Sequence, residues 1–169
     1  MTKRTFSWGK LLQYAIPTLL TLLWVCFIFS NSLQNGVESG NQSHRAQEML
    51  DQIFHGVGLE NPISEFFLRK LAHFGEFAVL SLLYIGNLAA FGCISLPQPL
   101  RFSALAVFSS VPVCFLVASV DEFLQRFSAG RAPQFTDVLI DTSGALTAAL
   151  CFFAVFCLRR RMKKKNAVA

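Results

Sequence analysis

Hydrophobic residues are arranged along the chain in four long stretches, which shorter polar segments separate. The stretches cover about residues 11–29, 71–91, 102–120 and 138–158. A helix needs about 20 predominantly apolar residues to cross a bilayer, so each stretch is long enough to span. The pattern predicts an all-α protein, an integral membrane bundle of four transmembrane helices. Pro112 lies inside the third stretch and predicts a kink there, because proline lacks the amide hydrogen of a helical residue.

A fifth segment, residues 43–57, has a different pattern. Its apolar residues recur at spacings of three and four, which is typical of an amphipathic helix; they are Ala46, Met49, Leu50, Ile53, Phe54 and Val57. This helix is too short and too polar to span, so we expect it at the outer surface of the bilayer. Asn61-Pro62 follows as a helix-start signal, and we expect that helix to continue into the second span.

Composition supports a membrane protein. Of the 169 residues 53% are hydrophobic and 15% are charged, whereas soluble domains carry about 25% charged residues. This excludes a disordered chain and a typical soluble enzyme, and it favours a single membrane domain over residues 1–169. The five cysteines show no CxxC spacing, so we interpret them as small apolar side chains.

Basic residues flank the first and last spans and predict the orientation of the bundle. Lys3, Arg4 and Lys10 precede the first span, and six further Lys and Arg residues lie in the tail 159–169. Because positive flanks stay in the cytoplasm, we expect both termini to be cytoplasmic. The segments 30–70 and 121–137 then face outward. We interpret the basic tail as a membrane flank, with no role in binding nucleic acid.

Ionisable residues occupy the ends of three spans. An ionisable side chain at the centre of a membrane helix costs about 2.5–3.5 kcal/mol of insertion free energy, so such residues in or next to a span point to a function. Lys70, His73 and Glu76 form one stripe at spacings of three. The other positions of this polar set are Asp121, Glu122, Gln125, Arg126, Arg131, Asp137 and Asp141. Under the expected topology all of them lie toward the outer side, so we predict one polar chamber that opens outward. The alternative is that these charges pair with one another and hold the helices together.

These motifs resemble those of the VanZ-like family of bacterial membrane proteins, named for an accessory protein of teicoplanin resistance. The matching stretches are Lys70-x-x-His73-x-x-Glu76, Asp121-Glu122-x-x-Gln125 and Arg131-x(5)-Asp137-x(3)-Asp141-x-x-Gly144. The resemblance implies a small helical domain in the bacterial cytoplasmic membrane with a link to the cell envelope. Two positions depart from the family pattern: Asn is common where this chain has Asp141, and Gly where it has Ala148.

Two classes of function fit this set of residues. The first is an enzyme that hydrolyses or transfers a group on a lipid-linked or cell-wall-related substrate. His73, Glu76, Asp121, Glu122 and Asp137 would be its catalytic residues, with His73 as general acid or base. Lys70, Gln125, Arg126, Arg131 and Asp141 would bind the substrate, since cationic side chains can contact a phosphate or carboxylate. His73-x-x-Glu76 supplies half of a site for a divalent cation.

The second class is a non-catalytic protein that binds an envelope lipid, a glycopeptide or a partner protein through the same chamber. The amphipathic segment 43–57 would be its docking surface. A proton-coupled transporter is a third reading, disfavoured for a monomer by four spans without an inverted repeat.

Overall fold

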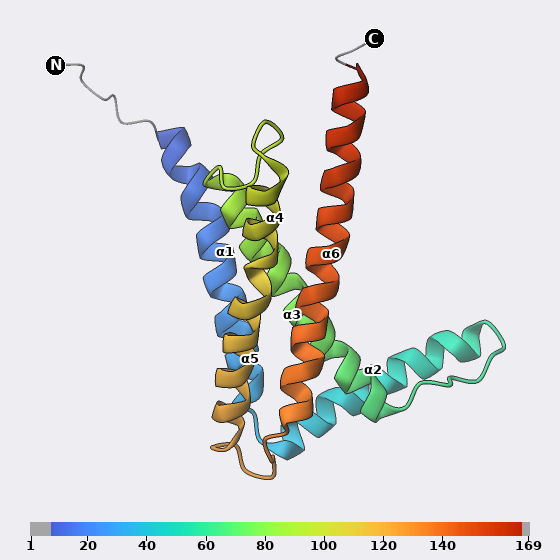
Figure 1. The fold of residues 1–169 in the computed structure, drawn as a ribbon. Helices are drawn as coiled ribbons and strands as arrows, with labels where there is room; N and C mark the ends of the chain where they lie inside the picture. The colour runs from blue at the N-terminus through green and yellow to red at the C-terminus, as the bar shows by residue number, and fades with distance from the viewer. Residues whose placement is uncertain (1–7, 167–169) are drawn as a thin grey trace.

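The computed structural model describes residues 8–166, which fold into helices joined by short connections (Figure 1). In chain order the helices are α1 (Trp8–Ser32), α2 (Gly36–Gly56), α3 (Glu65–Ala90), α4 (Leu100–Phe108), α5 (Ser110–Gln125) and α6 (Phe135–Asn166). The basic residues Lys3 and Arg4 and the last three residues of the predicted tail lie outside the described part of the chain.

The four predicted spans are confirmed as four segments that are long and apolar enough to cross a membrane. They are formed by α1, by α3, by α4 together with α5, and by α6. Large apolar side chains cover the outside of the bundle; Leu19 and Leu22 of α1, for example, are 57% and 59% exposed. Such a surface suits a lipid environment, because lipid tails are as apolar as these side chains. The all-α membrane fold predicted from the sequence is therefore confirmed.

The third span is interrupted where the proline predicts it. α4 ends at Phe108 and α5 begins at Ser110. Pro112 lies four residues after Phe108, so it cannot donate the backbone hydrogen bond that the Phe108 carbonyl would accept in a continuous helix, and its ring crowds that carbonyl. The break thus falls one turn before the proline itself.

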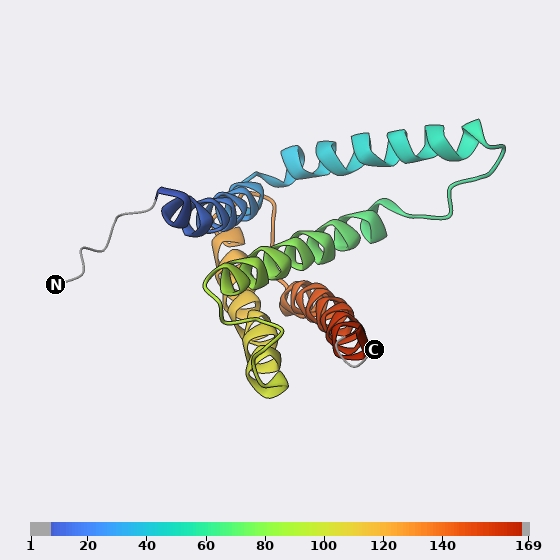
Figure 2. The same cartoon turned by 90° about the horizontal axis from the view of Figure 1, so that it is seen from above.

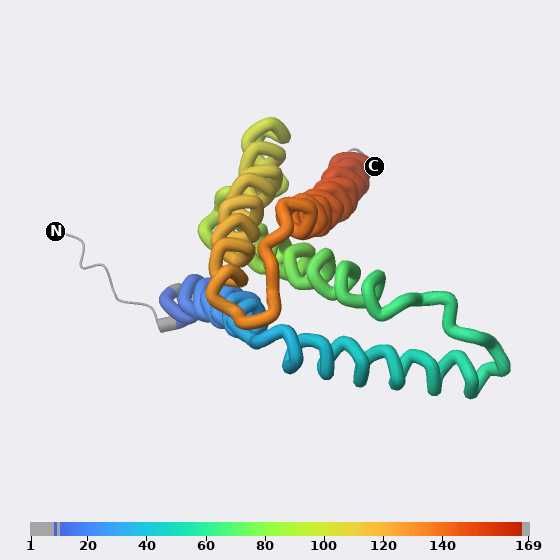
Figure 3. The backbone as a smooth tube through the Cα atoms, turned by 90° about the horizontal axis from the view of Figure 1, so that it is seen from below, coloured from blue at the N-terminus to red at the C-terminus, as the bar shows by residue number. Residues whose placement is uncertain are grey.

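The amphipathic helix α2 begins earlier than its hydrophobic pattern indicates. Asn35 caps it, since its side-chain oxygen accepts a hydrogen bond from the amide of Glu38 at 2.8 Å. Viewed along the bundle, α2 extends sideways from it and runs beside the first part of α3 (Figures 2 and 3). Met49 and Ile53 of its apolar stripe are exposed, at 66% and 65%, whereas Leu50 and Phe54 are half-buried, so only part of the stripe faces away from the bundle.

The start predicted for the second spanning helix is wrong by a few residues. The cap is Ser64, whose side chain accepts from the amide of Phe67, and α3 begins at Glu65. Asn61 instead stabilises the connection, where its side chain donates to Asp51 at 2.7 Å and accepts from the Ile63 amide at 2.9 Å. An Asn-Pro pair therefore marks a turn here, not the helix end.

The helices α3 and α6 pack closely, and this contact determines where the polar residues lie. A side chain on Gly144 of α6 would collide with the backbone carbonyl of Phe74 in α3. Ala145 and Ala148 are also buried along α6, and such small residues allow helices to approach closely. α1 begins and α6 ends at one end of the bundle (Figure 1), and α3 and α6 begin at the other, where Lys70 and Asp137 lie.

Candidate functional site

The site lies at the end of the bundle where α1 ends, α3 and α6 begin, and α5 ends. Lys70 in the second turn of α3 pairs with Asp137 in the first turn of α6. Their side chains are 12% and 10% exposed, so water screens the pair only weakly. This contact ties the starts of the two most closely packed helices together.

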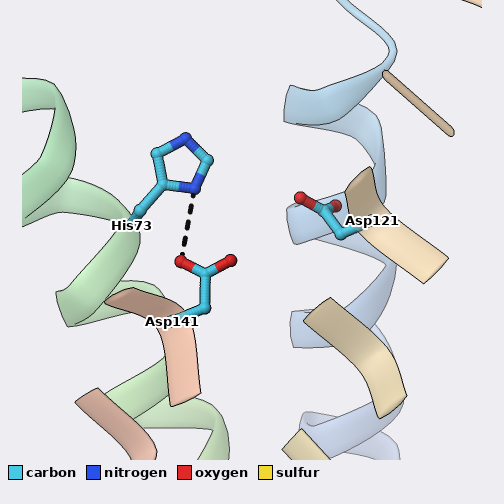
Figure 4. Close-up of side chains that lie close together, drawn as sticks. All are labelled: His73, Asp121 and Asp141. Atoms are coloured by element: carbon cyan, nitrogen blue, oxygen red, sulfur yellow. Dashed lines mark ion pairs between the residues drawn. The ribbon is translucent and has the colours of Figure 1, made fainter. Parts of the chain in front are cut away.

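One turn deeper, His73 of α3 faces Asp141 of α6. The imidazole Nδ1 lies 3.5 Å from Asp141 Oδ1, and the Asp141 side chain is 1% exposed. Figure 4 shows Asp121 of α5 across the gap, with its carboxyl directed toward this pair. Each of the three residues offers one ligand atom, and these atoms all lie within 4.8 Å of one another. Residues from three helices therefore converge on one point.

The end of α1 holds two of the carboxylates in place. Ser32 Oγ donates to Asp121 Oδ1 at 2.6 Å, and Asn31 Nδ2 donates to Glu76 Oε1 at 3.1 Å. A hydrogen bond to a charged oxygen is stronger than one between neutral groups. The polar end of the first span is thus part of the site, and it orients acids that come from α5 and α3.

The connection between α5 and α6 closes the site from the side. Arg131 donates from Nη1 to the backbone oxygens of Asn31 and Ser32, at 3.2 and 3.3 Å. Glu122 Oε2 accepts from the backbone amide of Gln134 at 2.7 Å. These contacts satisfy backbone groups at a helix end, and they place the Arg131 guanidinium at the end of α1.

Two neighbouring cavities open between α2, α3 and this connection. The first has a volume of about 170 Å³ and the second about 150 Å³. Ser39, Arg69, His73 and Arg131 line both. A histidine and two arginines thus face the same space, a combination that suits an anionic ligand.

Several buried polar atoms at the site have no hydrogen-bond partner among the described residues. They are His73 Nδ1, both carboxylate oxygens of Asp141, Glu122 Oε1 and Gln125 Nε2. Unpaired buried polar groups are costly, and in a native protein they require an explanation such as a bound ion, a water or a catalytic role.

The structure brings together nine of the ten residues singled out in the sequence. Glu122 and Asp137 are buried at the helix ends, and Gln125 lines the second cavity. Arg126 is the exception: it is exposed, and its guanidinium lies over the ring of Phe123, 5.6 Å from the ring centre. The exit of α5 turns this side chain away from the cavities, so the placement expected for Arg126 is wrong.

Arg69 was missed by the sequence reasoning, although it lines both cavities. It does not belong to the stripe at spacings of three that Lys70, His73 and Glu76 form. Arg69 precedes His73 by four and Glu76 by seven positions, which also places it on their side of a helix.

The fold and this arrangement define a multi-pass helical membrane protein with a polar site between its helices. The family model VanZ/LLP1 matches residues 18–157, and the chain belongs to this family. No curated protein and no solved structure was found to match it.

Proposed function

We propose that this protein is an enzyme of the bacterial cell envelope that hydrolyses or transfers a group on a lipid-linked substrate. The site would open to the outer side of the cytoplasmic membrane, with both termini cytoplasmic. The observation that carries the proposal is the position of His73. It lines both cavities, and its Nδ1 is buried without a hydrogen-bond partner beside Asp141.

Histidine suits proton transfer because its ordinary pKa lies near physiological pH. Asp141 lies 3.5 Å from its Nδ1 and would orient the ring. Glu76, one turn further along α3, also lines the first cavity, with its carboxylate held by Asn31. An imidazole that faces Asp141 and shares a cavity wall with Glu76 supports acid–base chemistry there.

The two arginines favour a substrate that carries a phosphate or a carboxylate. Arg69 and Arg131 line both cavities, and a guanidinium group can bind such an anion with two hydrogen bonds. Arg131 is held by two backbone carbonyls, which makes its position less dependent on the ligand.

The surroundings of the first cavity favour a lipid. Ala46 of α2 and Leu68 and Ala72 of α3 form an apolar part of its wall. The exposed apolar side of α2 suits a position at the membrane surface. A lipid could place its headgroup in the polar cavity while its acyl chains stay in the bilayer beside the apolar residues of α2.

The test uses the full chain reconstituted in nanodiscs with a bacterial membrane lipid extract that contains polyprenyl-phosphate-linked cell-wall precursors. Mass spectrometry follows the lipids, and a colorimetric assay follows released phosphate. We expect a lipid species to be converted by the wild type and at least tenfold more slowly by His73→Gln. Arg101→Gln, at the opposite end of the bundle, is the matched control. Equal conversion by His73→Gln and wild type, or none by either, would contradict the proposal.

A non-catalytic role has one observation in its favour: Lys70, Glu76, Asp121 and Glu122 already have protein partners. The protein would then bind an envelope lipid or a glycopeptide and act as an accessory protein. A link to teicoplanin resistance, which the family resemblance implies, would fit this role. Lipid that copurifies without turnover, together with changed teicoplanin susceptibility on expression, would favour this role.

A further inference from the structure

We infer that His73, Asp121 and Asp141 form a binding site for one divalent transition-metal ion, Zn²⁺ or Mn²⁺. Their ligand atoms lie within 4.8 Å of one another. Two ligands of a metal with bonds of about 2.1 Å are at most about 4.2 Å apart. Shifts of less than an ångström in three side chains would therefore close the set around an ion.

The strongest reason is the state of Asp141. Its side chain is 1% exposed, and neither carboxylate oxygen has a hydrogen-bond partner among the described residues. A buried carboxylate is stable only when it is paired, hydrogen-bonded or bound to a metal. Asp121, by contrast, has a hydroxyl partner in Ser32. Asp141 faces the gap between the helices, and among the described residues its one ion-pair partner is His73, at 3.5 Å.

The protein cations near Asp141 do not meet this need. Lys70 pairs with Asp137, one turn away on α6, and Arg131 donates to the backbone oxygens of Asn31 and Ser32. His73 faces Asp141 at 3.5 Å, which is longer than an ordinary hydrogen bond of about 2.7–3.2 Å. A separation of this size leaves both atoms free to bind a shared ion.

The donor set indicates the class of metal. One neutral imidazole and two carboxylates balance the charge of a divalent ion. Imidazole suits Zn²⁺ and related transition metals, whereas carboxylates suit Mn²⁺ and harder ions, so a mixed set favours the transition metals over Ca²⁺ or Mg²⁺. Three protein ligands leave a coordination position open, as in catalytic zinc sites.

The surroundings complete the site. The Ser32 hydroxyl donates to Asp121 Oδ1, and such a second hydrogen bond orients a metal ligand and raises affinity. His73 lines both cavities while Asp121 and Asp141 lie behind it. An ion could enter through the cavities and would then lie at their inner wall. Any part for the ion in turnover rests on the proposed function: with the ion bound His73 would be a ligand, and proton transfer at the cavity wall would fall to Glu76. Binding of the ion does not rest on that function.

The test measures metal binding without substrate. The full chain is purified in detergent, stripped with EDTA and dialysed against Zn²⁺ or Mn²⁺, and bound metal is counted by elemental analysis. Because the sequence has three histidines, the background variant His44→Ala/His55→Ala leaves His73 as the sole imidazole. We expect one ion per chain in this background. Asp141→Asn and Asp121→Asn should each lower the affinity at least tenfold.

Asp51→Asn is the matched control, because it is a carboxylate of α2 outside the site and asparagine can still accept from the Gln47 and Asn61 side chains. It should bind the ion as the wild type does. If the Asp121 or Asp141 variant fails to fold, a second measurement uses the metal-free background protein alone. Co²⁺ added to it should give visible absorption bands from the bound ion, and Zn²⁺ should abolish these bands by displacing the Co²⁺. Absence of both bound metal and bands, or equal affinity in the two Asp variants and the control, would overturn the inference. Metal binding without lipid turnover would instead overturn the proposed function alone.

Discussion

Gly144 of α6 lies directly against the backbone carbonyl of Phe74 in α3, with no space for even a methyl group between them. Phe74 is the neighbour of His73 along the chain, and Asp141 lies three residues before Gly144. The contact therefore determines the separation of the two helices at the level where the histidine meets the aspartate. Small residues at such crossings allow backbones to approach closely.

Replacing Gly144 by alanine should force α3 and α6 apart. We expect a loss of about 1–3 kcal/mol of stability, the usual cost of overpacking, together with weaker metal binding because His73 and Asp141 separate. Unfolding in mixed micelles with increasing SDS measures the first effect. Gly75→Ala is the control: a side chain there meets no atom within 4 Å, so stability should stay equal or rise. Equal stability of the two variants would contradict the expectation.

The pair Lys70–Asp137 should show strong coupling in a double-mutant cycle. Each single alanine variant leaves the other charge nearly buried without a partner, which is costlier than removing both. We expect a coupling free energy of about 0.5–3 kcal/mol between the two positions, measured from the same SDS unfolding curves. Additive effects of the two substitutions would show that the pair contributes nothing.

Ser32→Ala should destabilise the protein although it removes a single oxygen. Asp121 Oδ1 would lose its donor in a buried place, which costs about 1–3 kcal/mol. Ser30→Ala serves as the control, because the Ser30 hydroxyl is exposed and donates to the Phe27 carbonyl of its own helix. A similar small effect of both substitutions would refute a special role for Ser32.

Arg69→Gln should reduce conversion of the lipid substrate at least tenfold, mainly through a higher KM, because one of the two guanidinium groups in the cavities is lost. Arg101→Gln is the control here too, since its guanidinium lies over the ring of Phe102, 4.9 Å from the ring centre, at the start of α4. The nanodisc assay with matched protein amounts gives both values. Unchanged kinetics for Arg69→Gln would remove it from the substrate site.

The orientation can be tested by cysteine labelling in intact cells. Cys93 lies in the connection between α3 and α4, which we predict to be cytoplasmic. In a variant that retains this cysteine alone, a membrane-impermeant maleimide should react after cell lysis and not before. A cysteine at Asn61, introduced with all native cysteines replaced by serine, should react in intact cells. The reverse pattern would place the site on the cytoplasmic side.

The sequence by itself determined the class of the protein and pointed to most residues of the candidate site. A helix that crosses lipid needs about 20 apolar residues, so the four spans can be read directly from the hydrophobic pattern. The cost of ionisable groups within a membrane made Lys70, His73 and Asp141 conspicuous. Helical periodicity then placed each of them on one side of its own helix.

Only the tertiary structure decided which of these groups meet, because the distance between residues on different helices depends on packing and not on periodicity. Close contact at Gly144 places Asp141 beside His73, while the turn after α5 directs Arg126 away and brings Arg131 to the end of α1. Arg69 became a candidate site residue only because the structure shows that it lines both cavities between α2 and α3. Spacing along a single helix carries no information about such a space, which neighbouring elements create.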